Sequence, residues 1–201
     1  MKLVQEERSR ISRDLHDNVG ALVSFVSTKI DWVLRHKQVE REAVPDLEMV
    51  KDNAREIMSG LRETIWTLHN NKITNEDLAD RLKVYLKSHL LMPCDIHDLI
   101  SRETVISNEA VLGIYRSCQE IANNINRHSQ ATQVTVTFEN TRSKGIRITF
   151  VDDGIGMTAP QQNQEGHYGI ENLRLRLQEI GGSLEISSTP GKGTQVTITY
   201  D

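Results

Sequence analysis

The length, composition and charge of this chain exclude several broad classes of protein. Its 201 residues are enough to bury the core of one large domain or of two small ones. Charged residues make up 26% of the chain but the formal net charge is only -4, so a basic surface for direct nucleic-acid binding is not expected.

The cysteines and the apolar segments indicate a reducing compartment and no membrane contact. Cys94 and Cys118 lack CxxC spacing, which argues against a disulfide framework or a cysteine metal site. No apolar run reaches the roughly 20 residues that cross a bilayer, and the first residues lack the apolar stretch of a signal peptide. A helical pattern is already under way at Leu3, so we expect a cytoplasmic fragment of a longer protein, which could be anchored in the inner membrane.

The first part of the chain is predicted to form a helical hairpin that dimerises. From Leu3 to about Arg35, apolar residues recur every three or four positions, which is typical of an amphipathic helix. The same spacing returns from Leu47 to Leu68, and Pro45 is compatible with a first helical turn. A lone hairpin buries too narrow an apolar stripe to be stable, so we expect two copies to pair into a four-helix bundle.

The second part of the chain is predicted to be a helix-on-sheet domain. Asn70 to Asn75 breaks the helical periodicity and is predicted to be a linker, which gives domains at 1–70 and 71–201. The fold class is therefore α+β. The expected elements are helices at 76–91, 108–128 and 169–180 and strands at 134–138, 146–151, 184–188 and 195–200.

The second helix predicted in this domain carries polar residues that its own structure does not require. Asn123, Asn124 and Asn126 interrupt an apolar pattern, although asparagine is a mediocre helix former. Glu120, Asn124 and His128 are four residues apart and line one stripe, where carboxylate and amide oxygens could hold Mg2+. A solvated polar face is the alternative.

The segment VDDGIGM follows a predicted strand directly. Asp152 ends that strand, and Gly154 and Gly156 favour a sharp turn that lets the backbone approach a ligand. A carboxylate at this point can accept a hydrogen bond from an exocyclic amine. An ordinary Asp-Gly turn explains the same residues, so the motif alone leaves both interpretations open.

Two further glycine-containing segments lie toward the C-terminus. After the polar stretch TAPQQNQEGHY, which we expect to act as a lid, a helix begins whose N-terminal amides can face phosphate. Gly166 and Gly169 bracket the start of that helix. Gly191, Gly193 and Thr194 precede the last predicted strand, where small residues and a hydroxyl can approach a nucleotide. A simple hairpin turn is the alternative there.

The order of these four segments resembles the N, G1, G2 and G3 boxes of the ATPase superfamily shared by gyrase, the ninety-kilodalton heat-shock chaperone, mismatch-repair proteins and histidine kinases. The resemblance covers about residues 107–201. It implies an α/β sandwich that binds ATP with Mg2+, in which Asp152 binds the adenine amine and Asn124 holds the metal. The other nucleotide-site residues that it implies are Glu120, Arg127, His128, Gly154, Gly156, Gly166, Gly169, Gly191, Gly193 and Thr194.

The resemblance also implies separate roles within this set. Arg127 or His128, together with Thr194, would lie near the phosphates. Gly154 and Gly156 would shape the pocket. Glu120 matches the acid of the Asn box, whose role is less certain in kinases than in the hydrolytic relatives.

The first predicted helix indicates the branch of the superfamily. Its segment ERSRISRDLHDNVGALVS resembles the phosphoacceptor helix of the kinase subgroup that includes the nitrate/nitrite sensors and the membrane-fluidity sensor kinases. GLRETIWTL is similar to the end of that subgroup's second helix. The resemblance implies that His16 accepts the γ-phosphoryl group of ATP, with Asp17 as general base. An aspartate of a response-regulator receiver domain would then receive the group, as in bacterial two-component signalling.

Two other functions are compatible with parts of the sequence. A serine kinase of the anti-sigma type belongs to the same superfamily but is not expected to carry the RDLHD hairpin. A catalytically silent dimeric scaffold would bind a regulator without turning over ATP. The intact Asn124, Asp152, Gly154 and Gly156 argue against the scaffold.

Ala21 departs from the subgroup, which often has HDxxxQ with glutamine five residues after the histidine. That glutamine is thought to orient the water that hydrolyses the phosphorylated regulator, and alanine has no donor or acceptor. An alternative is that Ala21 relieves crowding between helices. We predict that phosphorylation of His16 is intact while dephosphorylation of a regulator is weak.

Ala21→Gln should therefore speed the decay of a purified phosphorylated cognate regulator, followed over time beside the wild-type chain. Strong decay with the wild type, and no gain from the glutamine, would contradict this interpretation of position 21.

Overall fold

The computed structural model describes residues 7, 10–13, 15–37, 39–70, 72–157 and 168–201. The chain divides into two compact units, Met1–Asn71 and Lys72–Asp201. The first is a helical hairpin and the second is a sheet covered by helices, so the predicted α+β class is confirmed. None of the described helices is long and apolar enough to cross a membrane.

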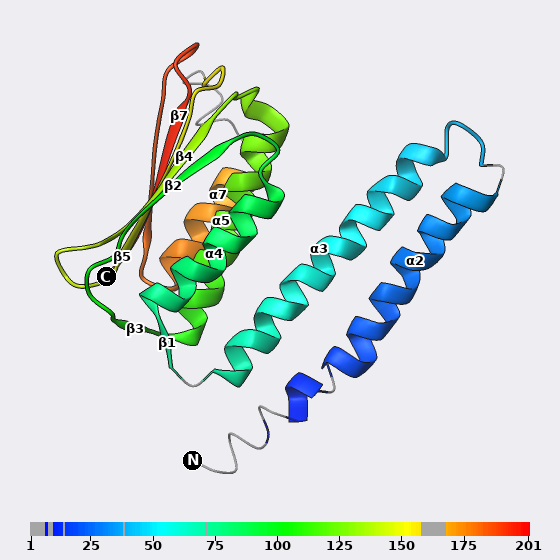
Figure 1. Ribbon diagram of the computed structural model, residues 1–201, viewed down its shortest axis with the longest axis horizontal. Helices are drawn as coiled ribbons and strands as arrows, with labels where there is room; N and C mark the ends of the chain where they lie inside the picture. Colours follow the sequence, from blue (N-terminus) through cyan, green and yellow to red (C-terminus); the bar gives the residue numbers. More distant parts are fainter. Residues whose placement is uncertain (1–6, 8–9, 14, 38, 71, 158–167) are drawn as a thin grey trace. The chain divides into compact units, whose positions relative to one another are not determined.

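The hairpin consists of α2 (Ala21–His36) and α3 (Val44–His69), which run side by side (Figure 1). Pro45 lies in the first turn of α3, as expected, where its missing N–H removes no helical hydrogen bond. Among the described residues of the hairpin, Ile30 of α2 and Ala54 of α3 are the buried apolar ones, at 9% and 4% exposure. An ion pair of 3.3 Å between Asp31 and Lys51 also joins the two helices.

A π-helical turn, η1 (Leu15–Gly20), precedes α2 and includes the backbone of His16. The sequence predicts one uninterrupted helix over this stretch, so that expectation is wrong at η1. Ile11, Leu15 and Val19 are separated by four residues twice in succession, which exceeds the roughly 3.6 residues of an α-helical turn. A wider turn takes up the excess and keeps these apolar side chains in line.

A second apolar stripe of the hairpin is exposed in a single copy. Its most exposed members on α2 are Leu22 and Phe25, at 67% and 60%. On α3 they are Met49 and Ile57, at 56% and 54%. Large apolar side chains that are exposed on both helices in this way are typical of an interaction surface.

Ala21 begins α2, and its side chain is exposed. The buried residue at this level is its neighbour Gly20, where a Cβ would lie 3.5 Å from Cδ2 of Leu61. Ala21 therefore does not relieve crowding within one hairpin, and the water-orienting interpretation of position 21 stays a prediction.

The second unit contains a five-stranded sheet in the order β2-β4-β5-β7-β6, in which β2 and β4 are parallel and the other neighbours antiparallel. The strands are β2 (Cys94–Leu99), β4 (Val134–Asn140), β5 (Ile146–Asp152), β6 (Ser183–Ser188) and β7 (Thr194–Tyr200). One face is covered by α4 (Asn75–His89), α5 (Asn108–Asn124) and α7 (Tyr168–Glu179), as Figure 1 shows. A π-helical turn, η2 (Ile125–Ser129), continues α5, and β1 (Ile73–Thr74) pairs with β3 (Val105–Ile106).

The core lies between the sheet and the helices, and β5 carries it up to the edge of the sheet. Ile146, Ile148, Phe150 and Asp152 are buried, and the residues between them point to the other face. Fully burying a side chain such as Phe150 contributes roughly 1.5–3 kcal/mol. The carboxylate of Asp152 therefore occupies the last place of an otherwise apolar row.

Strand β2 is absent from the elements that the sequence predicts. Its residues, CDIHDL, hide the alternation, because Asp is depleted in strands and both aspartates interrupt the apolar pattern. Asp98 is tied to the helix layer: its carboxylate accepts a hydrogen bond from Nζ of Lys83 on α4 at 2.6 Å. An ion pair thus occupies a position where a regular strand alternation would have an apolar residue.

The predicted linker Asn70–Asn75 is shorter than expected, because its last residues are buried in the second unit. Thr74 and Asn75 are 8% and 0% exposed, and Thr74 forms a reciprocal capping box with Asp77 at the start of α4. The side-chain Nδ2 of Asn75 donates to the Arg102 carbonyl at 2.9 Å, and its side-chain Oδ1 accepts from the Thr104 amide at 2.9 Å. Asn75 is therefore a structural tie of the second unit.

Asn75→Ala should lower the free energy of unfolding of the second unit by about 1–3 kcal/mol, because the Thr104 amide loses its acceptor and the Arg102 carbonyl keeps only its hydrogen bond from Nδ2 of Asn140. Urea unfolding followed by circular dichroism measures this. The control is Asn172→Ala on the exposed face of α7, which should change stability by less than about 0.5 kcal/mol. Equal effects of the two substitutions would contradict the role given to Asn75.

Candidate functional site

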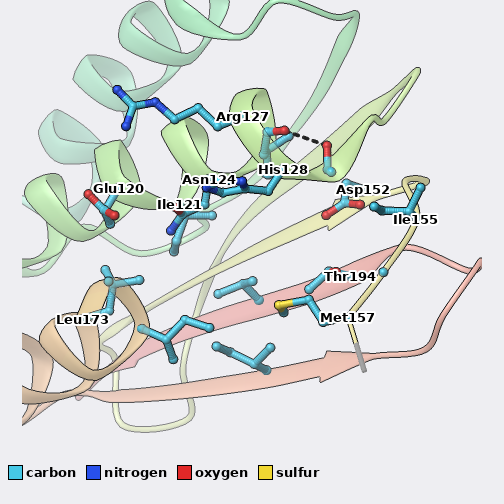
Figure 2. Close-up of a pocket in the computed structure, with 17 residues that line it drawn as sticks. Glu120, Ile121, Asn124, Arg127, His128, Asp152, Ile155, Met157, Leu173 and Thr194 are labelled. Atoms are coloured by element: carbon cyan, nitrogen blue, oxygen red, sulfur yellow. Dashed lines mark hydrogen bonds between the residues drawn. The ribbon is translucent and has the colours of Figure 1, made fainter. Parts of the chain in front are cut away.

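A cavity of about 570 Å³ lies between the helix layer and the sheet of the second unit (Figure 2). Its walls come from α5 and η2, the turn after β5, the start of α7, and strands β6 and β7. Its volume is within the range of ligand pockets, roughly 300–1,000 Å³. Most residues that the sequence assigned to the nucleotide line it, namely Glu120, Asn124, Arg127, His128, Asp152, Gly156, Gly169 and Thr194.

Two polar side chains reach the cavity from successive turns of α5, those of Glu120 and Asn124 (Figure 2). The start of α7 comes close to both of them at Gly169. A Cβ on Gly169 would lie 3.2 Å from Oε1 of Glu120 and 4.0 Å from Nδ2 of Asn124. Glycine therefore allows the first turn of α7, the positive end of its dipole, to begin beside these groups.

Two basic residues that line the cavity, Arg127 and His128, lie on the π turn η2. Both are exposed, and Figure 2 shows the Arg127 side chain extending away from Asp152. The chain leaves the turn at Gln130, whose φ of 52° is left-handed. The basic groups thus stand at the solvent side of the cavity, where an anionic part of a ligand can meet them.

Asp152 is the buried carboxylate of the cavity. The residue is 5% exposed, and its Oδ1 accepts a hydrogen bond from the Gly154 amide at 3.0 Å. Burial raises the pKa of Asp152, and hydrogen bonds from the backbone amides of Gly154 and Thr194 oppose that rise. A buried carboxylate beside apolar walls favours a ligand that donates a hydrogen bond to it.

Asp153 has the opposite environment. Its exposed carboxylate accepts hydrogen bonds from the Thr132 amide at 2.8 Å, the Thr132 hydroxyl at 2.5 Å and the Gln133 amide at 2.9 Å. These bonds lower the pKa of Asp153. Asp153 ties the residues before β4 to the end of β5, and of the two neighbouring aspartates it is Asp152 that lines the cavity.

The glycines of the turn after β5 are required by close packing of backbone on backbone. A Cβ on Gly154 would clash with the Ser129 carbonyl, and a Cβ on Gly193 would clash with the Asp152 carbonyl. Gly156 and Gly193 also have φ of 66° and 81°, in the left-handed region that glycine adopts at little cost. Side chains at these positions would force the walls of the cavity apart.

The segment PGKGT is both a hairpin turn and part of the cavity wall. It joins β6 to β7, and Gly191 has a φ of 74° there. The Gly191 amide donates to the Ile155 carbonyl at 2.7 Å, which joins the hairpin to the turn after β5. Thr194, the first residue of β7, lines the cavity. The two interpretations of this segment are therefore compatible.

Asn126 is not among the described residues that line the cavity. Its Oδ1 accepts from the Leu91 amide at 3.1 Å, and its Nδ2 donates to the His89 carbonyl at 2.8 Å. The expectation that structure does not require the asparagines of this helix is wrong for Asn126, because it holds the segment that follows α4.

Two serines that the sequence did not single out support the cavity. The Ser129 carbonyl accepts from the Ile155 amide at 2.8 Å. The Ser188 hydroxyl accepts from the Met157 amide at 2.7 Å. A single serine beside a turn is not a recognisable sequence motif, so these contacts can be seen only in the structure. The apolar walls, by contrast, follow from the helical spacing of residues such as Ile121 on α5.

Part of the predicted chemistry lies outside the described residues. This holds for residues 158–167 of the expected lid, which include Gly166, and for the side chain of His16. The backbone of His16 lies in η1, and Asp17, which follows it, is exposed. Their catalytic roles stay predictions.

The oxygen donors of the cavity fit a cation that brings its own water and phosphate ligands. Asn124 supplies an amide oxygen and Glu120 a carboxylate from the same wall. No three or more His, Cys, Asp or Glu side chains cluster as a metal site within the described part of the chain. Mg2+ commonly binds through few protein groups together with substrate phosphates, so the donor set fits Mg2+ on a nucleotide.

Comparisons with known proteins match both units. Residues 7–72 match the family described as "Histidine kinase" (HisKA_3), and residues 109–201 match the family described as "Histidine kinase-, DNA gyrase B-, and HSP90-like ATPase". The sensor histidine kinase LiaS of Bacillus subtilis is 32% identical over 203 residues, which are 98% of this chain and 54% of the relative. The chain belongs to the sensor histidine kinases of the HisKA_3 type.

Other relatives agree with this family. The nitrate/nitrite sensor protein NarQ of Escherichia coli is 23% identical, over 98% of this chain and 35% of the relative. A blue-light activated histidine kinase of Erythrobacter litoralis EL346 shares the fold, with a TM-score of 0.55 at 18% identity over 92% of this chain and 58% of that chain. The chain thus spans about half or less of the length of the curated sensor kinases named here.

Asp152→Asn should stabilise the nucleotide-free chain near pH 7, and Asp153→Asn should destabilise it. Because burial raises the pKa of Asp152, its ionised form costs folding free energy above that pKa. Because hydrogen bonds lower the pKa of Asp153, its ionised form adds stability above the unfolded value of about 3.9, and that stability is lost as the pH falls through the folded pKa.

Thermal unfolding at a series of pH values checks this pair. The two differences from the wild type should have opposite signs near neutral pH, and both should shrink at pH values below the range in which the two carboxylates titrate. Differences of the same sign would mean that the environments of the two aspartates are assigned wrongly.

Proposed function

We propose that this chain is the cytoplasmic catalytic core of a two-component sensor histidine kinase. It binds ATP with Mg2+ in the cavity of the second unit, transfers the γ-phosphoryl group to His16, and passes it to an aspartate of a response-regulator receiver domain. Residues 1–70 form the dimerisation and phosphotransfer domain and residues 71–201 the ATP-binding domain. The observation that carries the proposal is the buried Asp152, in one cavity with Asn124 and Glu120.

The adenine end of the nucleotide lies at Asp152. Among the described residues the carboxylate forms no ion pair, and the adenine 6-amine is a donor that satisfies it. Apolar side chains such as Ile121, Leu173 and Ile186 line the same cavity and can pack against the faces of the base. This combination of apolar walls with one buried acceptor is typical of sites that bind a flat, amine-bearing ring.

The phosphate end of the nucleotide lies at α5, η2 and the first turn of α7. When Mg2+ is bound, it neutralises phosphate charge. Asn124 holds Mg2+ through its amide oxygen, and Glu120 contributes a carboxylate beside it. Arg127 and His128 supply donors at the solvent side, and the start of α7 at Gly169 adds the positive end of a helix dipole. These groups act mainly by positioning and charge stabilisation.

His16 is the nucleophile of the transfer. A neutral imidazole attacks the γ-phosphorus with a ring nitrogen that carries a free lone pair, and the bond from that phosphorus to the bridging oxygen of ADP breaks. Asp17 accepts the N–H of the other ring nitrogen, which fixes the tautomer and stabilises the positive charge as it develops. The wider turn of η1 is a local departure of the kind often found at functional sites.

The homodimer follows from the exposed apolar stripe of the hairpin. Leu22 and Phe25 on α2 and Met49 and Ile57 on α3 are more than half exposed in one copy. A second hairpin that covers these side chains completes a four-helix bundle with an apolar interior. A stimulus-receiving part, anchored in the inner membrane, belongs to the rest of the full-length protein.

Labelled ATP tests the proposal. The wild-type chain should take up label that is labile to acid and stable to base, as expected of phosphohistidine. His16→Gln should abolish this label but leave ATP affinity within about twofold, because nucleophile and nucleotide pocket lie in different units. Asn124→Ala should also abolish most of the label, but through the loss of Mg2+-dependent activity.

The outcomes separate the competing functions. Acid-stable label would indicate a serine kinase, and no label with intact ATP binding would indicate a silent scaffold. Loss of ATP binding in His16→Gln, measured by isothermal titration, would refute the separation of acceptor and nucleotide site. Ser27→Ala on the hairpin is the matched control and should label like the wild type.

A further inference from the structure

Ser188, the last residue of β6, holds together two parts of the cavity wall without lining the cavity itself. Its hydroxyl oxygen accepts a hydrogen bond from the Met157 amide at 2.7 Å. The same hydroxyl donates to the Gly193 carbonyl at 3.0 Å and lies 2.9 Å from Oγ1 of Thr194. Met157 and Thr194 both line the cavity, and Figure 2 labels them on its sheet side.

A hydroxyl donates one hydrogen bond and accepts two. The Ser188 hydroxyl can therefore donate either to the Gly193 carbonyl or to Oγ1 of Thr194, but not to both. Gly193 is buried, and besides Ser188 its carbonyl has only a long bond of 3.4 Å from the Thr189 amide among the described contacts. Leaving such a buried carbonyl poorly paired is costly. Ser188 therefore donates to Gly193, and Thr194 has to donate to Ser188.

This assignment satisfies every hydrogen-bonding capacity of Ser188. It accepts from the Met157 amide and from the Thr194 hydroxyl, and it donates to the Gly193 carbonyl. The proton of the Thr194 hydroxyl is then directed at Ser188, so Thr194 has only its oxygen lone pairs to offer to a ligand. Thr194 faces the cavity as an acceptor beside its strand partner Asp152. The pairing puts Thr194 at the base of the nucleotide, whereas the sequence resemblance implies a place near the phosphates.

We infer that Ser188 is a positioning residue that sets base specificity: by holding Thr194 as an acceptor, it favours a base that presents an exocyclic amine over one that presents a carbonyl. The inference rests on the proposed function, because it concerns the base of the bound nucleotide. A carbonyl oxygen brought to the same place meets two acceptors and no donor. Without Ser188, the Thr194 hydroxyl can rotate and donate, which relieves part of this mismatch.

Inosine triphosphate is the probe for this inference, because it carries a carbonyl where ATP carries the amine. The quantity measured is the ratio of its Kd to that of ATP, by isothermal titration of the whole chain with Mg2+. The wild type should prefer ATP by about tenfold or more, equal to ~1.4 kcal/mol or more. Ser188→Ala and Ser188→Cys should lower this ratio by about threefold or more, and incompletely, because Asp152 still discriminates.

Two variants serve as controls, and Thr194→Val, alone and with Ser188→Cys, tests the role of Thr194. Ser187→Ala, at the exposed neighbouring position of β6, should keep the wild-type ratio. Ser188→Thr retains the hydroxyl and should also keep it. Thr194→Val removes the acceptor and should lower the ratio by itself, and adding Ser188→Cys to Thr194→Val should change it no further.

The ratio distinguishes this role from a merely structural one. A loss of folded protein weakens the binding of both nucleotides equally, so it cancels in the ratio of the two Kd values. An unchanged ratio in Ser188→Ala and Ser188→Cys, or in Thr194→Val, overturns the inference, as does an equal loss of affinity for the two nucleotides. If the wild type binds neither nucleotide, it is the proposed function that fails.

Discussion

The carboxylate of Asp152 has to be buried and still be available to accept a hydrogen bond from a ligand. The surrounding structure meets both requirements. It takes the last inward position of β5 after Ile146, Ile148 and Phe150, so the strand that builds the core also carries the charge. Two backbone amides relieve part of the cost of burial, and no basic side chain in the described part of the cavity wall pairs with the carboxylate. A site with this electrostatic preference selects a ligand that donates a hydrogen bond. The turn at Gly154 and the hairpin at Gly193 can pack closely around Asp152 because glycine has no side chain.

Departures from ideal helix geometry coincide with both ends of the proposed reaction. The turn η1 includes His16, and η2 carries Arg127 and His128 directly after Asn124. A π turn holds one residue more than the α-helical repeat, so it shifts which side chains share a face. Side chains that would lie on one face of a regular α-helix therefore point in different directions on either side of the π turn. The segment after the turn can still pack as it would in a regular helix.

The sequence predicted much of the fold and part of the site, for reasons that differ from residue to residue. α3, α5, β4 and β5 repeat an apolar pattern over enough residues for the pattern to identify them. β2 is different, because the Asp98 and Lys83 pair replaces an apolar signal with a charged one that only the folded sheet explains. The hydrogen bonds of Asn126 and Ser188 join residues distant in sequence. The four-residue spacing of Ile11, Leu15 and Val19 accompanies η1, but residue type alone does not indicate a π turn.

The close packing at Gly154, Gly156 and Gly193 means that these glycines can persist in the sequence for a structural reason, whether or not the chain binds ATP. These glycines are needed because carbonyls of Ser129, Asp152 and Thr189 lie where a Cβ would stand, so they are constrained by the fold. A descendant of this chain that had lost ATP binding would still need them in order to fold. Glycine motifs in degenerate relatives are therefore poor evidence of activity, and replacement of Asp152 or Asn124 is the change by which an inactive family member would be recognised.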